Sequence, residues 1–213
     1  MKIASWNLFH RAGATVDEIA RIVDDEKPDL FLMQEVTPAI EVLPEIAGGH
    51  FWWQPWSDKR YGMAIWSSSP LDGSSSLHLP KSPLPGIFPR RFAQVTETDG
   101  ITISNVHLSH GQVLNRRQLS HIAKDADGAM VIMGDFNAVG PTILKYFEDV
   151  GPRNPTHRAQ KLLPLRLDRC LVRNMKCTEA RVLHPHSSDH HPIVVSLEPK
   201  VIDTHLTKSA DGD

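Results

Sequence analysis

Residues 129–137, Ala129-Met130-Val131-Ile132-Met133-Gly134-Asp135-Phe136-Asn137, join a short apolar run directly to an acidic tetrapeptide. The uninterrupted apolar run predicts a strand that is buried on both faces. Gly134-Asp135-Phe136-Asn137 has the composition of a tight turn. Layered α/β folds present side chains to a ligand where strands end, so this stretch predicts both a sheet and a site beside it.

The same arrangement, a polar residue at the end of an apolar strand, recurs along the chain. Its members are Asn7 after the strand from Lys2, Glu35 after the strand from Asp29, Asn105 and His107 at the end of the strand from Ile101, Asp168 within 166–169, and Asp189 and His190 before the strand from Pro192. No single one of these residues is specific evidence for a functional site. Their recurrence in order predicts one site assembled from the ends of many strands.

The segments between these strands predict helices and turns. Thr15 and Glu18 have capping-box spacing at the start of a helix that Pro28 ends, and a second helix is expected from Thr37-Pro38 to Gly48-Gly49. A third helix is expected over 113–126, a hairpin turn at Asp99-Gly100, and a loop over 67–90. The remaining expected strands are 62–66, 91–97, 101–108, 167–172, 177–183 and 192–197. We therefore expect one α/β domain over 1–198, with a mixed sheet or two packed sheets, and a disordered tail over 199–213.

Composition narrows the class of protein. The chain has 213 residues, is 40% hydrophobic and has a formal charge of −2, so binding to nucleic acid through bulk positive charge is excluded. No apolar run approaches the length of a transmembrane helix. A chemistry-bearing motif at the start leaves no room for a signal peptide. Cys170 and Cys177 are expected to be free thiols. We expect a cytoplasmic monomer.

The residue types indicate the chemistry. Asn7 and Glu35 offer hard oxygen ligands, which suit Mg²⁺ or Mn²⁺. Neighbouring residues on a strand point apart, so His190 is expected to pair with Asp168 from another strand rather than with Asp189. Imidazoles titrate near neutral pH and can serve as acid or base, while Asn137 can donate to a phosphate oxygen without adding charge.

These motifs resemble the endonuclease/exonuclease/phosphatase superfamily, which includes DNase I, abasic-site endonucleases, neutral sphingomyelinases and inositol-phosphate 5-phosphatases. The matching stretches are 2–7, Gln34-Glu35, 134–138 and Ser188-Asp189-His190-His191-Pro192-Ile193, and the resemblance extends to about residue 198. It implies a four-layer α/β sandwich, in which two mixed sheets pack face to face with helices outside.

The resemblance also implies a metal site and an attacking water. Asn7 and Glu35 would hold Mg²⁺ or Mn²⁺, with Asp189 close to it. Asp135 would orient the water, and Asn137 would bind the scissile phosphate. The reaction implied is in-line attack of water on phosphorus.

The remaining implied roles belong to basic side chains. His190, supported by Asp168, would act as base or phosphate ligand, and His107 would protonate the leaving oxygen. Arg91 resembles a strand arginine that contacts phosphate, although Arg90 can replace it in the alignment.

Three departures from the family pattern bear on the substrate. Phe9 stands where abasic-site endonucleases carry an acidic residue, and they lack a histidine at the position of His107, so abasic-site repair is disfavoured. DNase I has a glutamate before an Arg-Tyr pair, where this chain has Lys59-Arg60-Tyr61. A different partner must therefore orient His107. The short chain also indicates trimmed substrate loops.

Two segments have no assigned role. Residues 51–56, Phe-Trp-Trp-Gln-Pro-Trp, either pack in the core as a strand or offer a platform for bases or a lipid interface. Residues 153–176 carry seven Lys and Arg against one carboxylate, Asp168. That segment is either a solvated face or a local attractor for an anionic substrate.

Three functions compete. The favoured one is a phosphodiesterase acting on nucleic acid, and the alternative is an esterase for a phospholipid or small phosphorylated molecule. A catalytically inactive binding module is disfavoured because Asp135, Asn137, Asp189 and His190 are all present.

Overall fold

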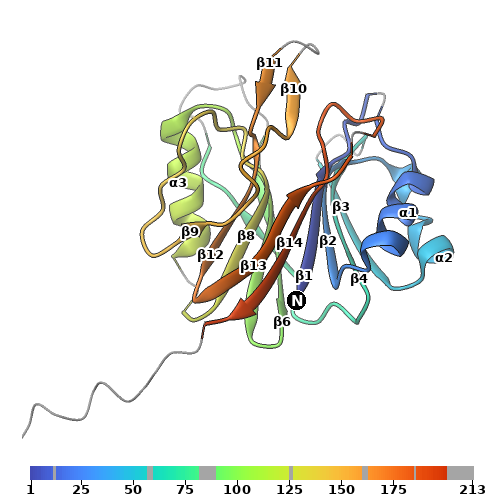
Figure 1. Ribbon diagram of the computed structural model, residues 1–213, viewed down its shortest axis with the longest axis horizontal. Helices are drawn as coiled ribbons and strands as arrows, with labels where there is room; N and C mark the ends of the chain where they lie inside the picture. The colour runs from blue at the N-terminus through green and yellow to red at the C-terminus, as the bar shows by residue number, and fades with distance from the viewer. Residues whose placement is uncertain are drawn as a thin grey trace, which may run out of the picture.

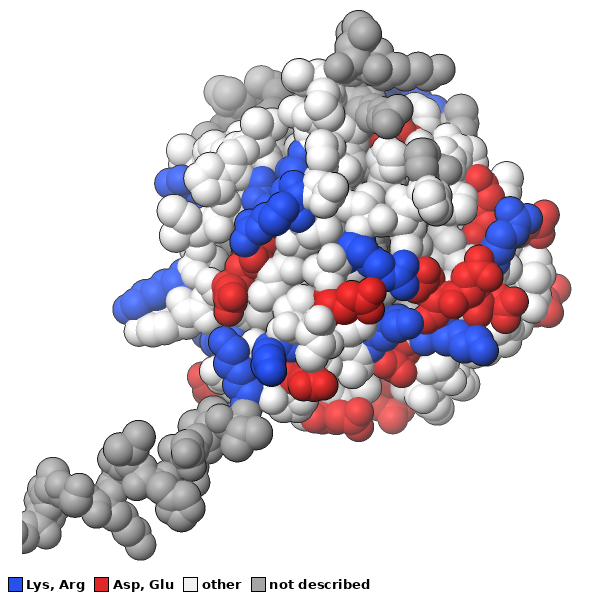
Figure 2. All heavy atoms as spheres, in the orientation of Figure 1, with Lys and Arg blue, Asp and Glu red and all other residues white. Residues whose placement is uncertain are grey.

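The structure is a computed structural model that describes residues 1–11, 13–56, 60–81, 90–124, 127–159, 163–184 and 186–200. Two six-stranded mixed sheets pack face to face, and helices lie on their outer sides (Figure 1). This is the four-layer α/β sandwich that the resemblance implied. On the face shown in Figure 2, acidic and basic side chains lie side by side instead of forming separate fields, in keeping with the small net charge.

The first sheet has the order β13-β14-β1-β2-β4-β3, and only the β1–β2 pair in it is parallel. Its strands are β1 (Lys2–Asn7), β2 (Leu30–Val36), β3 (His50–Pro55), β4 (Gly62–Ser67), β13 (Met175–Val182) and β14 (Ile193–Pro199). Helix α1 (Val16–Glu26), the 3₁₀ helix η1 (Pro38–Ile40) and helix α2 (Leu43–Ala47) follow β1 and β2 in the chain, and α1 and α2 cover the outer face of this sheet (Figure 1).

The second sheet has the order β5-β6-β7-β8-β12-β9, with β7 and β8 parallel. Its strands are β5 (Ser75–His78), β6 (Phe92–Thr98), β7 (Ile101–His107), β8 (Met130–Asp135), β9 (Glu148–Asp149) and β12 (Asp168–Arg173). Helix α3 (Gln112–Ala123) covers its outer face, and a small ribbon of β10 (His157–Ala159) and β11 (Leu163–Leu165) stands above the sheets (Figure 1).

Apolar residues fill the space between the two sheets and the space under each helical layer. Leu32 and Ile65 from one sheet meet Ile103 and Val131 from the other, and all four are fully buried. Burial of apolar area in these layers is the main favourable contribution to folding. Near the site the layer between the sheets turns polar: Gln34 Nε2 donates to Asn105 Oδ1 at 2.7 Å.

Several local predictions are confirmed. Thr15 and Glu18 form the capping box of α1. Asp99 and Gly100 both have positive φ, 53° and 72°, as a tight hairpin turn between β6 and β7 requires. Cys170 and Cys177 are free thiols, although only Cys170 is buried. Among the described residues, no helix is long and apolar enough to span a membrane.

Other local predictions were wrong. The second expected helix is divided into η1 and the short α2. The expected loop over 67–90 contains strand β5, whose sequence, Ser75-Ser76-Leu77-His78, has no apolar alternation because the strand lies exposed at a sheet edge. Residues 82–89 of that loop lie outside the described residues, as does 201–213 of the expected tail, whose first residue, Pro199, belongs to β14 instead.

Candidate active site

Strand register brings the polar strand ends together at one edge of the sandwich. In the parallel β7–β8 pair His107 lies opposite Asp135, and in the antiparallel β8–β12 pair Asp168 lies opposite the same Asp135. In the other sheet Asn7 lies opposite Gln34, the residue before Glu35. The sequence motifs thus become one site because their strands are neighbours.

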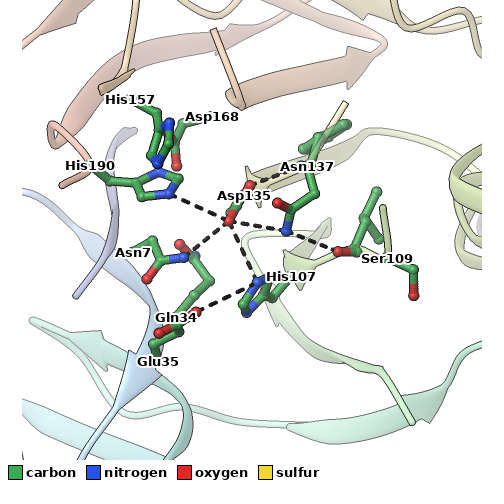
Figure 3. Close-up of polar contacts among 12 residues, drawn as sticks. Asn7, Gln34, Glu35, His107, Ser109, Asp135, Asn137, His157, Asp168 and His190 are labelled. Carbon is green, nitrogen blue, oxygen red and sulfur yellow. Dashed lines mark hydrogen bonds and ion pairs between the residues drawn. The ribbon is translucent and has the colours of Figure 1, made fainter. Parts of the chain in front are cut away.

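Asp135 is the centre of this site (Figure 3). Its Oδ2 accepts hydrogen bonds from Asn7 Nδ2 at 3.0 Å and Asn137 Nδ2 at 3.2 Å, and its Oδ1 accepts from the Asn137 backbone N–H at 2.8 Å. His107 Nε2 and His190 Nε2 lie 3.5 and 3.8 Å from Oδ2. Burial, which disfavours the charged carboxylate, raises the pKa of Asp135 despite the nearby His190. Asp135 is therefore a carboxylate poised to accept a proton.

His190 pairs with Asp168, as predicted: His190 Nδ1 lies 2.8 Å from Asp168 Oδ2. Burial alone lowers the pKa of an imidazole, but the carboxylates of Asp168 and Asp135 outweigh it and raise the pKa of His190 to about 10. His190 is therefore an imidazolium at neutral pH. An imidazolium can bind phosphate or donate a proton, so of the two readings of His190, base or phosphate ligand, its charge favours the ligand.

His107 is in the opposite state. Its burial, together with the positive charges of Arg91 and His190, lowers its pKa well below the ordinary value, so it is neutral. Its Nε2 lies 3.5 Å from Asp135 and 4.0 Å from Glu35 Oε1. These two carboxylates are the acidic neighbours that the sequence did not identify for His107.

Glu35 reaches the site through an irregularity in β2. The register shifts between Gln34 and Val36, and Glu35 has a φ of 56°. Such bulges redirect a side chain and are common beside active sites. Glu35 Oε2 accepts from the backbone N–H of His10 at 3.2 Å and also contacts His10 Nδ1, while the His10 ring stacks on Tyr61 with centroids 3.9 Å apart. No sequence motif points to His10.

The predicted metal ligands, Asn7, Glu35 and Asp189, line one cavity of about 240 Å³. Their hard oxygen donors fit Mg²⁺ or Mn²⁺. Glu35 contacts His10, whereas Asp189 Oδ2 lies 3.5 Å from His157 Nε2.

Among the described residues, two sets of acidic and histidine side chains place their ligand atoms within 4.8 Å of one another. These are Asp135, Asp168 and His190, and His157, Asp189 and His190. Both contain His190, an imidazole whose Nδ1 already contacts Asp168 Oδ2, whereas Asn7 and Glu35 offer oxygen ligands. We therefore regard the oxygens of Asn7 and Glu35 as the better fit to a hard cation.

His157 is a second histidine that the sequence did not identify. Its ring lies against the His190 ring with centroids 4.5 Å apart, and it lines the cavity. The buried Thr156 fixes this segment, since its backbone carbonyl accepts from His191 N–H and its hydroxyl accepts from Asp168 N–H. The hydrogen bond from His157 and the charges of His190 and His157 outweigh burial and lower the pKa of Asp189. His110, to which the sequence assigned no role, also lines the cavity.

Arg91, rather than the exposed Arg90, lines the cavity. Its guanidinium lies 5.4 Å from the ring centre of Trp56, which packs against Phe92. The other aromatic residues of 51–56 belong to β3 and pack against the apolar clusters of the first sheet. The core-packing reading of this segment is therefore confirmed, and Trp56 supports Arg91.

Two face-to-face mixed sheets with few helices match the DNase I-like fold. The chain belongs to the endonuclease/exonuclease/phosphatase family, whose sequence model matches residues 4–190. A search of curated proteins gave no sequence match.

Solved structures share the fold at low sequence identity. A conserved protein of unknown function from Enterococcus faecalis V583 is 18% identical, with a TM-score of 0.77 over 93% of this chain and 100% of that one. A family member from Bacteroides vulgatus is 15% identical, with a TM-score of 0.75 over 93% and 98%. The 3′ phosphatase NExo from Neisseria, solved with a product DNA hairpin, is 19% identical, with a TM-score of 0.65 over 93% and 99%.

Proposed function

We propose that this phosphoesterase is a Mg²⁺- or Mn²⁺-dependent phosphodiesterase that acts on nucleic acid by in-line attack of water. The observation that carries the proposal is the position of Asp135 Oδ2, which lies 3.5 Å from the neutral His107 and 3.8 Å from the protonated His190. This places a proton acceptor beside a fixed positive charge, the two groups that hydrolysis of an anionic phosphodiester requires.

In the proposed reaction Asp135 accepts the proton of the attacking water, and Asn7 and Asn137 hold its carboxylate in place. The imidazolium of His190 and the guanidinium of Arg91 stabilise negative charge on the phosphate oxygens. His107 is neutral because burial, together with these cations, depresses its pKa. A bound anionic phosphate offsets the cations and so favours uptake of a proton from solvent by His107, which can then donate that proton to the leaving oxygen.

Asn7 and Glu35 would hold the divalent ion, which supplies further stabilisation of charge on phosphate when bound. Asp189 lies beside His157 in the same cavity and contributes negative charge there.

A phospholipid or small phosphoester remains the second candidate substrate, because the side chains at the centre of the site contact only the phosphate in this mechanism. The cytoplasmic monomer expected from the sequence is part of the same proposal, and the two free thiols support a reducing compartment.

The proposal is tested with bis-p-nitrophenyl phosphate in Mg²⁺, Mn²⁺ and EDTA, followed by plasmid DNA, RNA, phospholipid micelles and sugar phosphates. We expect EDTA to abolish turnover and Asp135→Asn to reduce it by at least about 10²-fold. Asp17→Asn, on the exposed side of α1, is the matched control. Equal turnover by Asp135→Asn and the wild type would refute the assignment of Asp135, and full activity in EDTA would refute the metal requirement.

A further inference from the structure

A second cavity, of about 380 Å³, borders the loop that leaves Asn137. It is lined by residues 139–142, Asp149, Arg153, Arg166 and Arg169. It lies outside the cavity that holds Asp135 and His190, and its three arginines come from the basic segment 153–176. On the face shown in Figure 2, basic side chains gather in the region of β9 and β12, with acidic ones directly beside them.

Three guanidinium groups share a single carboxylate in this cavity. Arg166 binds Asp149 through two hydrogen bonds of 2.7 Å, Arg169 Nη1 lies 3.1 Å from Asp149 Oδ2, and Arg153 Nη1 lies 3.7 Å from the same oxygen. The cavity therefore keeps a surplus of positive charge. The segment 153–176 is thus not simply a solvated face, because Arg166 and Arg169 are largely buried.

The surplus positive charge lowers the pKa of a buried arginine in the cavity. Burial and the neighbouring Arg166 both lower the pKa of Arg169, although Asp149 opposes them. The Thr142 hydroxyl also lines the cavity, and it is buried without a hydrogen-bond partner among the described residues. A bound anion would offset the surplus positive charge and would accept a hydrogen bond from the Thr142 hydroxyl.

Hydrogen bonds from a residue of this cavity hold a segment of the active site. Arg169 Nη2 donates to the carbonyl oxygens of Ala138 at 3.0 Å and Gly140 at 2.5 Å, so it holds the chain immediately after Asn137. Its neighbour Asp168 begins β12 and holds His190 on the other face of the same strand. Arg153, at the rim, keeps 75% of its side chain exposed and available to a ligand.

We propose that this cavity binds a backbone phosphate of a polynucleotide, next to the phosphate that is cleaved. The inference rests on the proposed function. A polynucleotide carries further phosphates on both sides of the scissile one, whereas a phospholipid or small phosphodiester with a single phosphate has none to place in a second site. A guanidinium cluster matches phosphate in charge and in hydrogen-bond geometry. With a net charge of −2, the chain has no bulk field to attract a polyanion, so local sites must do so.

The experiment measures binding of a fluorescein-labelled single-stranded oligonucleotide in EDTA, by fluorescence anisotropy across a salt series. We expect Arg153→Gln to weaken binding and to reduce the slope of log affinity against log salt by about one. Arg153→Lys should restore the slope, because it restores the charge. Arg21→Gln, an exposed arginine on α1 of the other sheet, removes the same charge and should leave the slope unchanged.

Turnover of bis-p-nitrophenyl phosphate separates this inference from the proposed function. Arg153→Gln should leave that turnover unchanged, because the small diester does not reach the second cavity. Absence of turnover in the wild type would contradict the proposed function instead. Equal salt slopes for Arg153→Gln and Arg21→Gln would overturn the inference. So would binding to anionic vesicles that depends on Arg153 while oligonucleotide binding does not.

Discussion

His190 Nδ1 lies 2.8 Å from Asp168 Oδ2, and this contact joins the two sheets at the edge that carries the active site. Asp168 begins β12 of the second sheet and is fully buried, while His190 precedes β14 of the first sheet. The pair fixes the orientation of the imidazole and keeps it charged. It therefore links the packing of the sandwich to the charge on which the proposed chemistry depends.

Replacing Asp168 with asparagine should remove that charge. The largest favourable contribution to the proton on His190 comes from the Asp168 carboxylate, so Asp168→Asn should lower the pKa of His190 from about 10. NMR titration of the His190 ring measures the change. Phosphodiesterase turnover should fall by about 10²-fold or more. Asp72→Asn, an exposed aspartate, is the control, and a His190 pKa unchanged by Asp168→Asn would contradict the pairing.

The same pair predicts how stability depends on pH. The folded pKa of His190, about 10, lies above the ordinary value of 6.5, so the folded state holds this proton more tightly than the unfolded state. The resulting stabilisation is fully present below pH 6.5 and is lost as the pH rises through about 10. Urea unfolding of the wild type and His190→Gln at several pH values measures it. The difference in unfolding free energy between the two should shrink across this range, and a constant difference would contradict the prediction.

His10 should strengthen metal binding by holding Glu35. His10 contacts Glu35 Oε2 through both its backbone N–H and its ring, and its ring is fixed by stacking on Tyr61. Removing a side chain that orients a metal ligand typically weakens binding by about 10- to 100-fold. Calorimetric titration of Mn²⁺ into His10→Ala should show a loss of this size. His184→Ala, at an exposed position, should bind Mn²⁺ like the wild type, and equal affinity of both variants would refute the role of His10.

Gly134 is required by the close approach of β7 and β8. It has a φ of 144°, and a Cβ at this position would lie 2.1 Å from the carbonyl oxygen of Val106. Gly134→Ala should therefore destabilise the fold by more than about 2 kcal/mol, as backbone clashes in a core do. Thermal unfolding measures this. Gly73→Ala is the control, since it also has a positive φ but has open space around the new methyl group; equal losses would remove the steric explanation.

Much of the fold and the centre of the site follow from local signals. The strands that carry Asp135, His107 and Asp168 are marked by apolar runs, and the helix cap at Thr15 by its spacing to Glu18. The short strands β9, β10 and β11 escaped detection because two or three residues are too few to show a period. Their pairing depends on neighbours distant in the chain.

The contacts that the sequence missed are all between distant segments. His10 meets Glu35 only because a bulge in β2 turns that glutamate toward it, and His157 meets Asp189 only because Thr156 fixes its strand. Asp149 lies just before the basic segment, and nothing local indicates that it binds Arg166.

The sequence by itself determined the longer strands that carry the site, the polar residues at their ends, and hence most of the candidate side chains of the site. Only the tertiary structure decided their protonation: His190 is charged and His107 neutral, although both are buried imidazoles at strand ends. The physical reason is that burial disfavours charge on both rings alike. His190 has a carboxylate at 2.8 Å that outweighs this cost, whereas His107 faces the positive charges of Arg91 and His190.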